Sequence, residues 1–366
     1  MSDVPTAIRT VGIIADPGIA QTLASRASQK LEDRLNQAVD ASYKWKIHVD
    51  SYTLPMGKSG RVALNDKVPT LREKHGWNYI IYLTDVPHYV QDRPVRSVVS
   101  YQESSAVISV PSLGFARLSV LIKHLAKLIQ ELSTGQPPVA PPSQLRKKIS
   151  IEASLPDGEQ SQDRVTSIEG LRGRLLLIGG MIRSNRPWRL VPKLSSAMAG
   201  AVATGAFGVF YTSIWSMADY LSTPRLASIT VFSILVLTLW LLLHNRLWEK
   251  PEGSRRRERL IIYNTATVLT VALAASAMYI LLFIALMAGS LIVIDQDYLA
   301  SQLAHEVGLA EYFNLAWLAS SLGLLGSAVG SSFDDVARVQ RATFSQREYE
   351  RRNMEFSIDN SEADSA

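Results

Sequence analysis

The chain contains no cysteine among its 366 residues. This absence excludes disulfide bonds, thiolate nucleophiles and metal sites with cysteine ligands. Acidic and basic residues are also missing from several long stretches between residues 194 and 333, whereas residues 1–170 mix charged and apolar side chains as a soluble domain does. The two halves of the chain are therefore expected to fold in different surroundings.

Familiar catalytic and cofactor-binding motifs are missing as well. Gly-Lys-Ser at 57–59 lacks the first glycine of a phosphate-binding loop, because that position is Tyr52. The first predicted strand offers only Gly12 and Gly18, not the Gly-x-Gly-x-x-Gly of a dinucleotide site. We therefore expect no metal and no cofactor, and the lack of a catalytic set favours a protein that is not an enzyme.

Four segments of the second half are long and apolar enough to be transmembrane helices, since about 20 helical residues cross a bilayer. None contains an ionisable side chain or a proline, which disfavours an ion-coupled transporter. The sequence predicts a four-helix transmembrane bundle over 194–333, with the lipid bilayer as its partner. The segments lie at about 194–217, 226–243, 265–294 and 315–333.

Lysine and arginine gather on one side of these four segments, and such cations mark the cytoplasmic border of a membrane protein. An even number of crossings agrees, so both termini are expected in the cytoplasm and the protein in the plasma membrane. Because the excess of 38 Lys+Arg over 33 Asp+Glu lies largely at this border, we expect no nucleic-acid partner. Trp188 suits the headgroup level. The border cations are Arg183, Arg186, Arg189, Lys193, Arg246, Lys250, Arg255, Arg256, Arg257, Arg259, Arg338, Arg341, Arg347, Arg351 and Arg352.

Amphipathic segments flank the bundle on both sides. Residues 168–193 predict a short helix on the inner membrane surface followed by a basic elbow, and a helix packed on the bundle is the alternative. Residues 334–366 predict a basic helix that begins at Asp334 and Asp335, continues to residue 352 and lies near anionic headgroups, followed by a disordered acidic tail. A solvated helix, or contact with the soluble domain, is equally compatible with that pattern.

Small residues recur at a spacing of four in the first and fourth apolar segments. Such faces let two helix backbones approach closely. We expect packing within the chain, with homodimerisation as the alternative. The residues are Ala197, Ala201, Gly205, Gly323, Gly326 and Gly330.

Residues 1–134 alternate between strand and helix patterns, which predicts a cytoplasmic α/β domain with a partly parallel sheet. Residues 135–167 are rich in proline and polar residues and predict a linker. Strands are expected at 8–18, 45–54, 78–85, 95–103 and 105–113, and helices at 19–39, 68–76 and 115–133.

Polar residues follow several of these predicted strands. Ligands of an open α/β sheet bind beyond the carboxyl ends of its strands, and a helix N-terminus there is an anion site. Ordinary turn and capping roles are the alternative. The residues of this candidate ligand cleft are Asp16, Thr84, Asp85, His88, Arg93 and Ser112.

Four blocks of sequence occur in an order similar to that of a known family: WNYIIYLTDVP, RPVRSVVS, AVISVPSLG and RSNRPWRLVPKLSSAMAG. The chain resembles a family of multi-pass membrane proteins of Gram-positive bacteria, chiefly actinobacteria, that has no established activity. The resemblance implies a membrane location and this two-part architecture. Some relatives carry the label methylenetetrahydrofolate dehydrogenase, which no motif here supports.

The leading hypothesis is an inner-membrane protein with a cytoplasmic sensor or scaffold domain. The first alternative is a membrane-tethered enzyme that acts on a small anionic substrate through Asp16, Asp85 and Arg93. The second is a transporter or channel subunit. A homo-oligomer and a membrane-protein partner both stay open.

Overall fold

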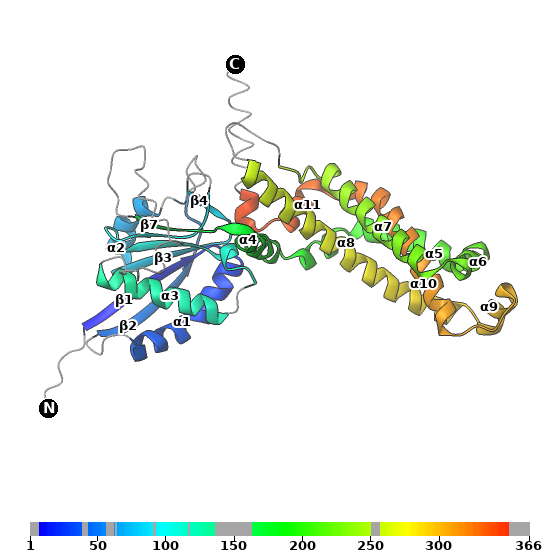
Figure 1. Ribbon diagram of the computed structural model, residues 1–366, viewed down its shortest axis with the longest axis horizontal. Coiled ribbons are helices and arrows are strands. Elements are labelled where there is room, and N and C mark those ends of the chain that lie inside the picture. The colour runs from blue at the N-terminus through cyan, green and yellow to red at the C-terminus, as the bar shows by residue number, and fades with distance from the viewer. Residues whose placement is uncertain are drawn as a thin grey trace, which may run out of the picture. The chain divides into compact units, whose positions relative to one another are not determined.

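The computed structural model describes residues 7–38, 43–55, 62, 64–90, 93–115, 118–135, 163–249 and 257–350. The chain divides into two compact units (Figure 1). The α/β unit comprises Met1–Ser184, Glu252–Ile262 and Ser345–Ala366, and the helical unit comprises Asn185–Pro251 and Tyr263–Phe344. The predicted division into an α/β half and a helical half is confirmed. Two later segments of the chain nevertheless belong to the α/β unit.

A seven-stranded mixed sheet forms the centre of the α/β unit. The strand order is β2-β1-β3-β6-β5-β4, and β7 also pairs with β5. Strands β2, β1, β3 and β6 are parallel, whereas β5 runs antiparallel to its three neighbours. The strands are β1 (Ala7–Ala15), β2 (Tyr43–Ser51), β3 (Tyr79–Thr84), β4 (His88–Val90), β5 (Arg93–Ser100), β6 (Ser105–Ser109) and β7 (Asp163–Ser167).

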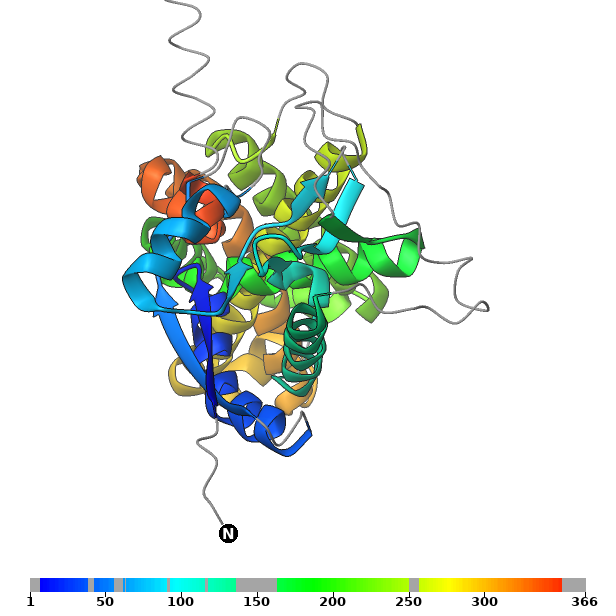
Figure 2. The same cartoon turned by 90° about the vertical axis from the view of Figure 1, so that its left-hand side faces the viewer.

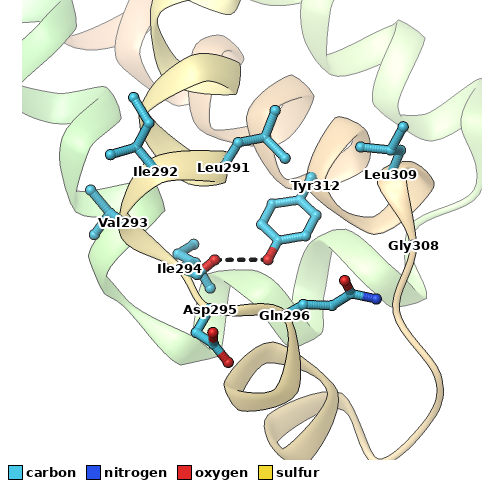
Figure 3. A pocket seen from close by; sticks show the side chains of 9 residues that line it. All are labelled: Leu291, Ile292, Val293, Ile294, Asp295, Gln296, Gly308, Leu309 and Tyr312. Atoms are coloured by element: carbon cyan, nitrogen blue, oxygen red, sulfur yellow. Dashed lines mark hydrogen bonds between the residues drawn. The ribbon is translucent and has the colours of Figure 1, made fainter.

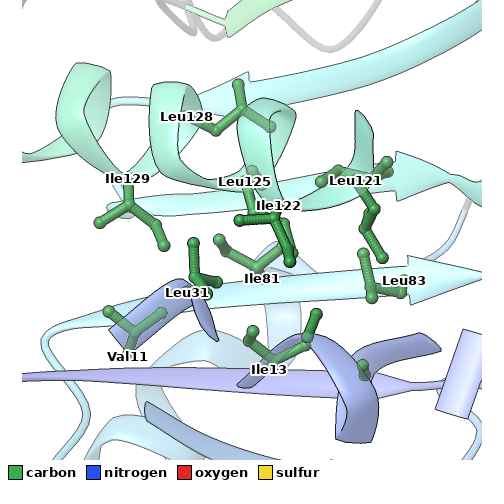
Figure 4. Close-up of a cluster of buried hydrophobic side chains, with 14 of the residues drawn as sticks. Val11, Ile13, Leu31, Ile81, Leu83, Leu121, Ile122, Leu125, Leu128 and Ile129 are labelled. Atoms are coloured by element: carbon green, nitrogen blue, oxygen red, sulfur yellow. The ribbon is translucent and has the colours of Figure 1, made fainter. Parts of the chain in front are cut away.

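Helices cover both faces of this sheet. Helices α1 (Ile19–Ala38) and α3 (Leu118–Thr134) pack on one face, where their apolar stripes meet alternate residues of β1 and β3 (Figure 4). Helix α2 (Val68–His75) packs on the other face (Figure 2), with Trp77 and the inward side chains of the same strands. Strands β3 and β6 and the second half of β1 are therefore buried on both sides, which explains their nearly continuous apolar sequences, whereas the edge strand β2 is only partly buried and mixes polar with apolar residues.

Gly12 lies in β1 where the ring of Trp77 crosses the strand. A Cβ atom at Gly12 would lie 1.9 Å from Trp77 Cε3. Gly12→Ala is expected to lower the free energy of unfolding by about 3 kcal/mol, because the ring is buried and has little space to retreat. Thermal unfolding of the full-length protein in mild detergent measures this. Combining Gly12→Ala with Trp77→Leu is expected to cost less than the sum of the single changes, and strict additivity would contradict the contact.

Two strands of the sheet differ from the sequence expectation. Strands β4 and β7 were not predicted. Strand β7 lies inside the segment 135–167 that was predicted to be a linker, so the linker prediction is wrong for the last five residues of that segment. Residues 136–162 lie outside the described part. The strand is short and polar, and tertiary contacts hold it. It pairs with β5, and Arg164 Nη1 lies 2.7 Å from Glu131 Oε2 of α3.

Helix α4 (Gly170–Asn185) packs on the α/β unit, a contact that neither alternative for residues 168–193 included. Leu177 and Met181 are buried, and a Cβ atom at Gly180 would lie 2.0 Å from the carbonyl oxygen of Pro111. The opposite face leaves Leu171 and Leu175 exposed. The apolar face that suggested a membrane surface is thus partly used for packing within the α/β unit.

The helical unit contains three helices that are long and apolar enough to cross a membrane: α7 (Thr223–His244), α8 (Arg257–Val293) and α10 (Leu309–Gly330) with the 3-10 turn that follows it. Helix α8 begins in the α/β unit and continues into this one. A fourth candidate is the pair α5 (Ser195–Phe210) and α6 (Thr212–Tyr220), bent by 85°. Helices α6 and α9 (Gln296–Leu303) lie at one end of the unit and α11 (Val336–Thr343) at the other (Figure 1).

The first apolar segment is therefore two helices that meet at a sharp bend, not the single helix that was expected at about 194–217. The backbone of Tyr211 is extended and ends α5. At this break the indole nitrogen of Trp215 donates to the carbonyl oxygen of Val209, at 3.0 Å. An aromatic side chain that caps the end of α5 is a tertiary contact, and the apolar composition alone gives no sign of it.

Small residues join α5 and α10 within the chain. A Cβ atom at Gly323 would lie 2.6 Å from the carbonyl oxygen of Ala201, and one at Gly330 would lie 2.5 Å from that of Ser196. Ala197, Ala201 and Gly205 are buried in α5. This geometry favours packing within the chain over homodimerisation as the explanation of the small-residue pattern.

The segment after α10 is broken rather than continuous. Helix α11 begins at its N-cap Asp335, as the sequence suggested, but ends before the extended Phe344. Asp334 instead accepts hydrogen bonds from Ser196 N and Ala197 N, at 3.1 and 3.3 Å, and so caps α5. A second helical stretch follows at 346–350, and the acidic tail lies outside the described residues.

Candidate functional site at the strand ends

Asp16 follows β1, the strand between β2 and β3, and its side chain is fully buried. One carboxylate oxygen accepts a hydrogen bond from the hydroxyl of Tyr82. The other accepts from Thr84 Oγ1 at 2.7 Å and from the backbone N of Asp85 at 2.9 Å. Three donors from β3 and the residue after it therefore fix the orientation of this carboxylate.

Asp85 caps the helix that follows β1. Its two carboxylate oxygens accept from the backbone N of Ile19 and of Ala20, at 3.0 and 2.9 Å. The N-terminus of α1, which is the usual anion site of an open α/β sheet, thus already holds a carboxylate. Gly18 is required here, because its φ is +141° and a Cβ atom would lie 2.4 Å from Asp85 Oδ2.

Arg347 reaches this place from the C-terminal segment, and only 2% of its side chain is exposed. Its Nη2 donates to the carbonyl oxygen of Leu54, which lies in the segment that follows β2. Its Nε lies 3.8 Å from Asp16 Oδ1, and Nη1 lies 3.6 Å from Glu350 Oε2. The backbone N of Leu54 in turn donates to the hydroxyl of Tyr82, at 3.0 Å. Asp16, Tyr82, Leu54 and Arg347 thus form a closed ring of contacts.

Burial raises the pKa of Asp16 above its ordinary value, and Arg347 together with the hydrogen bonds lowers it part of the way back. Burial likewise raises the pKa of Tyr82, so this hydroxyl keeps its proton and donates to Asp16. The site is consequently one in which negative charge is costly without a nearby cation. Arg347 supplies that cation.

The other members of the predicted cleft do not join this ring. Arg93 is exposed at the start of β5, three strands from β1, and at about 4.8 Å per strand this is roughly 14 Å away. His88 begins the edge strand β4 and is buried. Ser112 donates to the carbonyl oxygen of Ser109 at 2.5 Å. Asp16, Thr84 and Asp85 come together as predicted, but in largely capping and orienting roles.

The sequence did not single out Tyr82, Leu54 or Arg347 as site residues. Arg347 was counted among the cations near the membrane, and the structure places it inside the α/β unit instead. Arg259 is also buried there, with its guanidinium 5.0 Å from the ring centroid of Tyr89. A buried arginine has the same sequence pattern as an exposed one, so only the tertiary structure distinguishes the two.

The remaining border residues that the structure describes are half-buried or exposed. Arg183 and Arg186 are half-buried, and Lys250, Arg255, Arg256, Arg351 and Arg352 lie outside the described residues. The exposed members are Trp188, Arg189, Lys193, Arg246, Arg257, Arg338 and Arg341.

A cavity of about 530 Å³ lies in the helical unit between the end of α8 and the start of α10 (Figure 3). Three polar side chains of its lining already have partners. Tyr312 donates to the carbonyl oxygen of Ile294, Gln296 to that of Val307, and Asp295 caps α9. Apart from Gly308, the other residues that line the cavity have aliphatic side chains.

A scan against protein-family models and searches of curated proteins and of solved structures found no match for this chain. The site is therefore interpreted from its own chemistry. That chemistry is a fixed buried carboxylate and a backbone carbonyl facing one guanidinium group.

Proposed function

We propose that this chain is an integral plasma-membrane protein with four crossings, and that its α/β unit is a cytoplasmic sensor or scaffold module. Three long apolar helices support the membrane location. Large apolar side chains are exposed along them, among them Phe232, Leu235 and Ile284. So much contiguous apolar surface is unfavourable in water and favourable in lipid.

The contacts of the segment Glu252–Ile262 support an even number of membrane crossings between residue 185 and this segment. The proposed topology depends on these contacts. Glu258 Oε1 lies 2.9 Å from Arg174 Nη2, and Arg259 lies over Tyr89. Because these partners belong to the α/β unit, the chain must return to its starting side between residues 185 and 251. Helix α7 alone would leave it on the opposite side, so the bent α5–α6 pair makes the other crossing.

The C-terminal segment supports an even number of membrane crossings in the second half of the helical unit as well. Arg347 contacts Asp16 and Leu54 within the α/β unit. Residues 263–344 therefore also cross an even number of times, through α8 and α10. The excess of arginine and lysine on this side favours the cytoplasm.

The filled strand-end site favours a sensor or scaffold over an enzyme. In an open α/β sheet this is the position where substrates bind. Here Asp85 occupies the anion site and Arg347 occupies the space beside Asp16. An enzyme that used Asp16, Asp85 and Arg93 on one small anion is disfavoured, because Arg93 lies too far away for near-contact catalysis.

Reporter fusions test this topology. A reporter that is active only outside the cytoplasm is expected to be active after residues 222 and 305 and silent after residues 180 and 360. Activity after residue 180 or 360, or silence after 222 or 305, would contradict the proposal.

A transporter or channel subunit is the second candidate, and the bend between α5 and α6 is the observation that favours it. Discontinuous helices line the sites of many transporters. Protein reconstituted in liposomes that moves no solute would argue against this candidate.

A further inference from the structure

We propose that the carboxyl ends of β1, β2 and β3 form a binding site for a guanidinium group, and that Arg347 is a displaceable internal ligand of that site. This inference rests on the proposed function, because it names the chemical group that the sensor module recognises.

The acceptors of this site converge from two strand ends. Asp16 follows β1 and Leu54 follows β2, and both offer an oxygen to the same guanidinium. Tyr82, Thr84 and the backbone of Asp85 hold the Asp16 carboxylate in place. The acceptors are therefore oriented by groups other than Arg347, and such preorganisation is what distinguishes a binding site from a chance ion pair.

The charge of the site selects a cation. Asp16 and Asp85 are both buried, and Asp85 already neutralises the N-terminus of α1. An anionic group would meet two carboxylates, whereas a guanidinium meets a carboxylate and a carbonyl. A planar guanidinium also offers five N–H donors in a fixed geometry, which a lysine side chain does not.

Arg347 satisfies this site only in part. Within the described part of the chain it makes one hydrogen bond, to Leu54, and its contacts with Asp16 and Glu350 are ion pairs at 3.8 and 3.6 Å. Its buried Nε has no hydrogen-bond acceptor among the described residues. A ligand that used more of the donors would compete well with it. Because the segment 345–350 follows the helical unit directly in the chain, occupancy of the site depends on where that segment is held.

Chemical rescue tests this proposal in the full-length protein in mild detergent. Arg347→Ala removes the internal ligand, and methylguanidinium at millimolar concentrations is the probe, with N-methylurea as its neutral analogue. We expect methylguanidinium to raise the unfolding temperature of Arg347→Ala saturably, by roughly 3–5 °C at ten times its dissociation constant. The wild type is expected to show a smaller shift, because Arg347 competes with the probe for the site, and adding Asp16→Asn to the variant is expected to abolish the shift. No stabilisation, or equal stabilisation by N-methylurea, would overturn the proposal.

A second measurement keeps the proposal testable if Arg347→Ala does not fold. Since the chain has no cysteine, Ser345→Cys introduces the only thiol, at a buried position. Asp16→Asn is expected to increase the rate at which a maleimide labels this thiol by about tenfold, because the segment is released more often. An unchanged rate would mean that Asp16 does not hold the segment. Neither measurement depends on the membrane orientation, so a wrong topology would leave both results unaffected.

Discussion

Arg347→Met is expected to lower the free energy of unfolding of the α/β unit by about 3 kcal/mol at neutral pH. The change keeps much of the side-chain volume but leaves the buried Asp16 without its cation, and breaking a buried ion pair from one side costs several kcal/mol. Thermal unfolding in mild detergent measures the loss. Arg338→Met, which removes an exposed arginine of α11, is the matched control and is expected to change stability by less than about 0.5 kcal/mol.

The loss of stability caused by Arg347→Met is also expected to depend on pH. Burial raises the pKa of Asp16, and removing Arg347 raises it further because the arginine lowers it. At pH values between the pKa of Asp16 in the unfolded chain and its raised pKa in the folded variant, the folded variant therefore binds more protons than the unfolded chain. Its stability falls as the pH rises through that window. The difference from wild type should be smaller at pH 5 than at pH 8. An equal difference at both pH values would argue against an ionised Asp16 beside Arg347.

Gly323→Ala is expected to destabilise the helical unit by about 3 kcal/mol. The added Cβ atom would lie 2.6 Å from the carbonyl oxygen of Ala201 and 3.1 Å from the Cα atom of Gly205. Both are backbone atoms of α5, so the contact is relieved only by separating the two helices. Thermal unfolding in detergent measures this effect too.

Gly289→Ala is the control for that substitution. Gly289 lies in α8 of the same unit, and a Cβ atom there would meet nothing within 4 Å. The change is expected to be neutral or to stabilise by up to about 1 kcal/mol, because alanine has the higher helix propensity. If Gly323→Ala and Gly289→Ala behaved alike, the close packing of α5 on α10 would be wrong.

Sequence patterns predicted what depends on local composition. The buried strands β1 and β3 and the helix α3 follow from apolar periodicity. The long helices α7, α8 and α10 follow from the absence of charge. The strand-end position of Asp16, Thr84 and Asp85 follows from the rule that loops after parallel strands meet at one edge of the sheet.

What the sequence did not predict depends on partners distant in the chain. The bend at Tyr211 accompanies a cap from Trp215, and β7 forms because β5 offers a free edge and α3 offers Glu131. The burial of Arg347 is the clearest case. It depends on Asp16, more than 300 residues earlier, and no local pattern marks the pair.

The accessibility of position 257 tests the central claim most directly, because the topology depends on the side to which residues 252–262 return. Single cysteines are introduced by Ser222→Cys, Gln302→Cys and Arg257→Cys, all at exposed positions of a chain without cysteine. In intact cells a membrane-impermeant maleimide is expected to label positions 222 and 302 and to label position 257 only after lysis. Labelling of position 257 in intact cells, together with 222, would mean that α5 and α6 do not cross the membrane and would contradict the account.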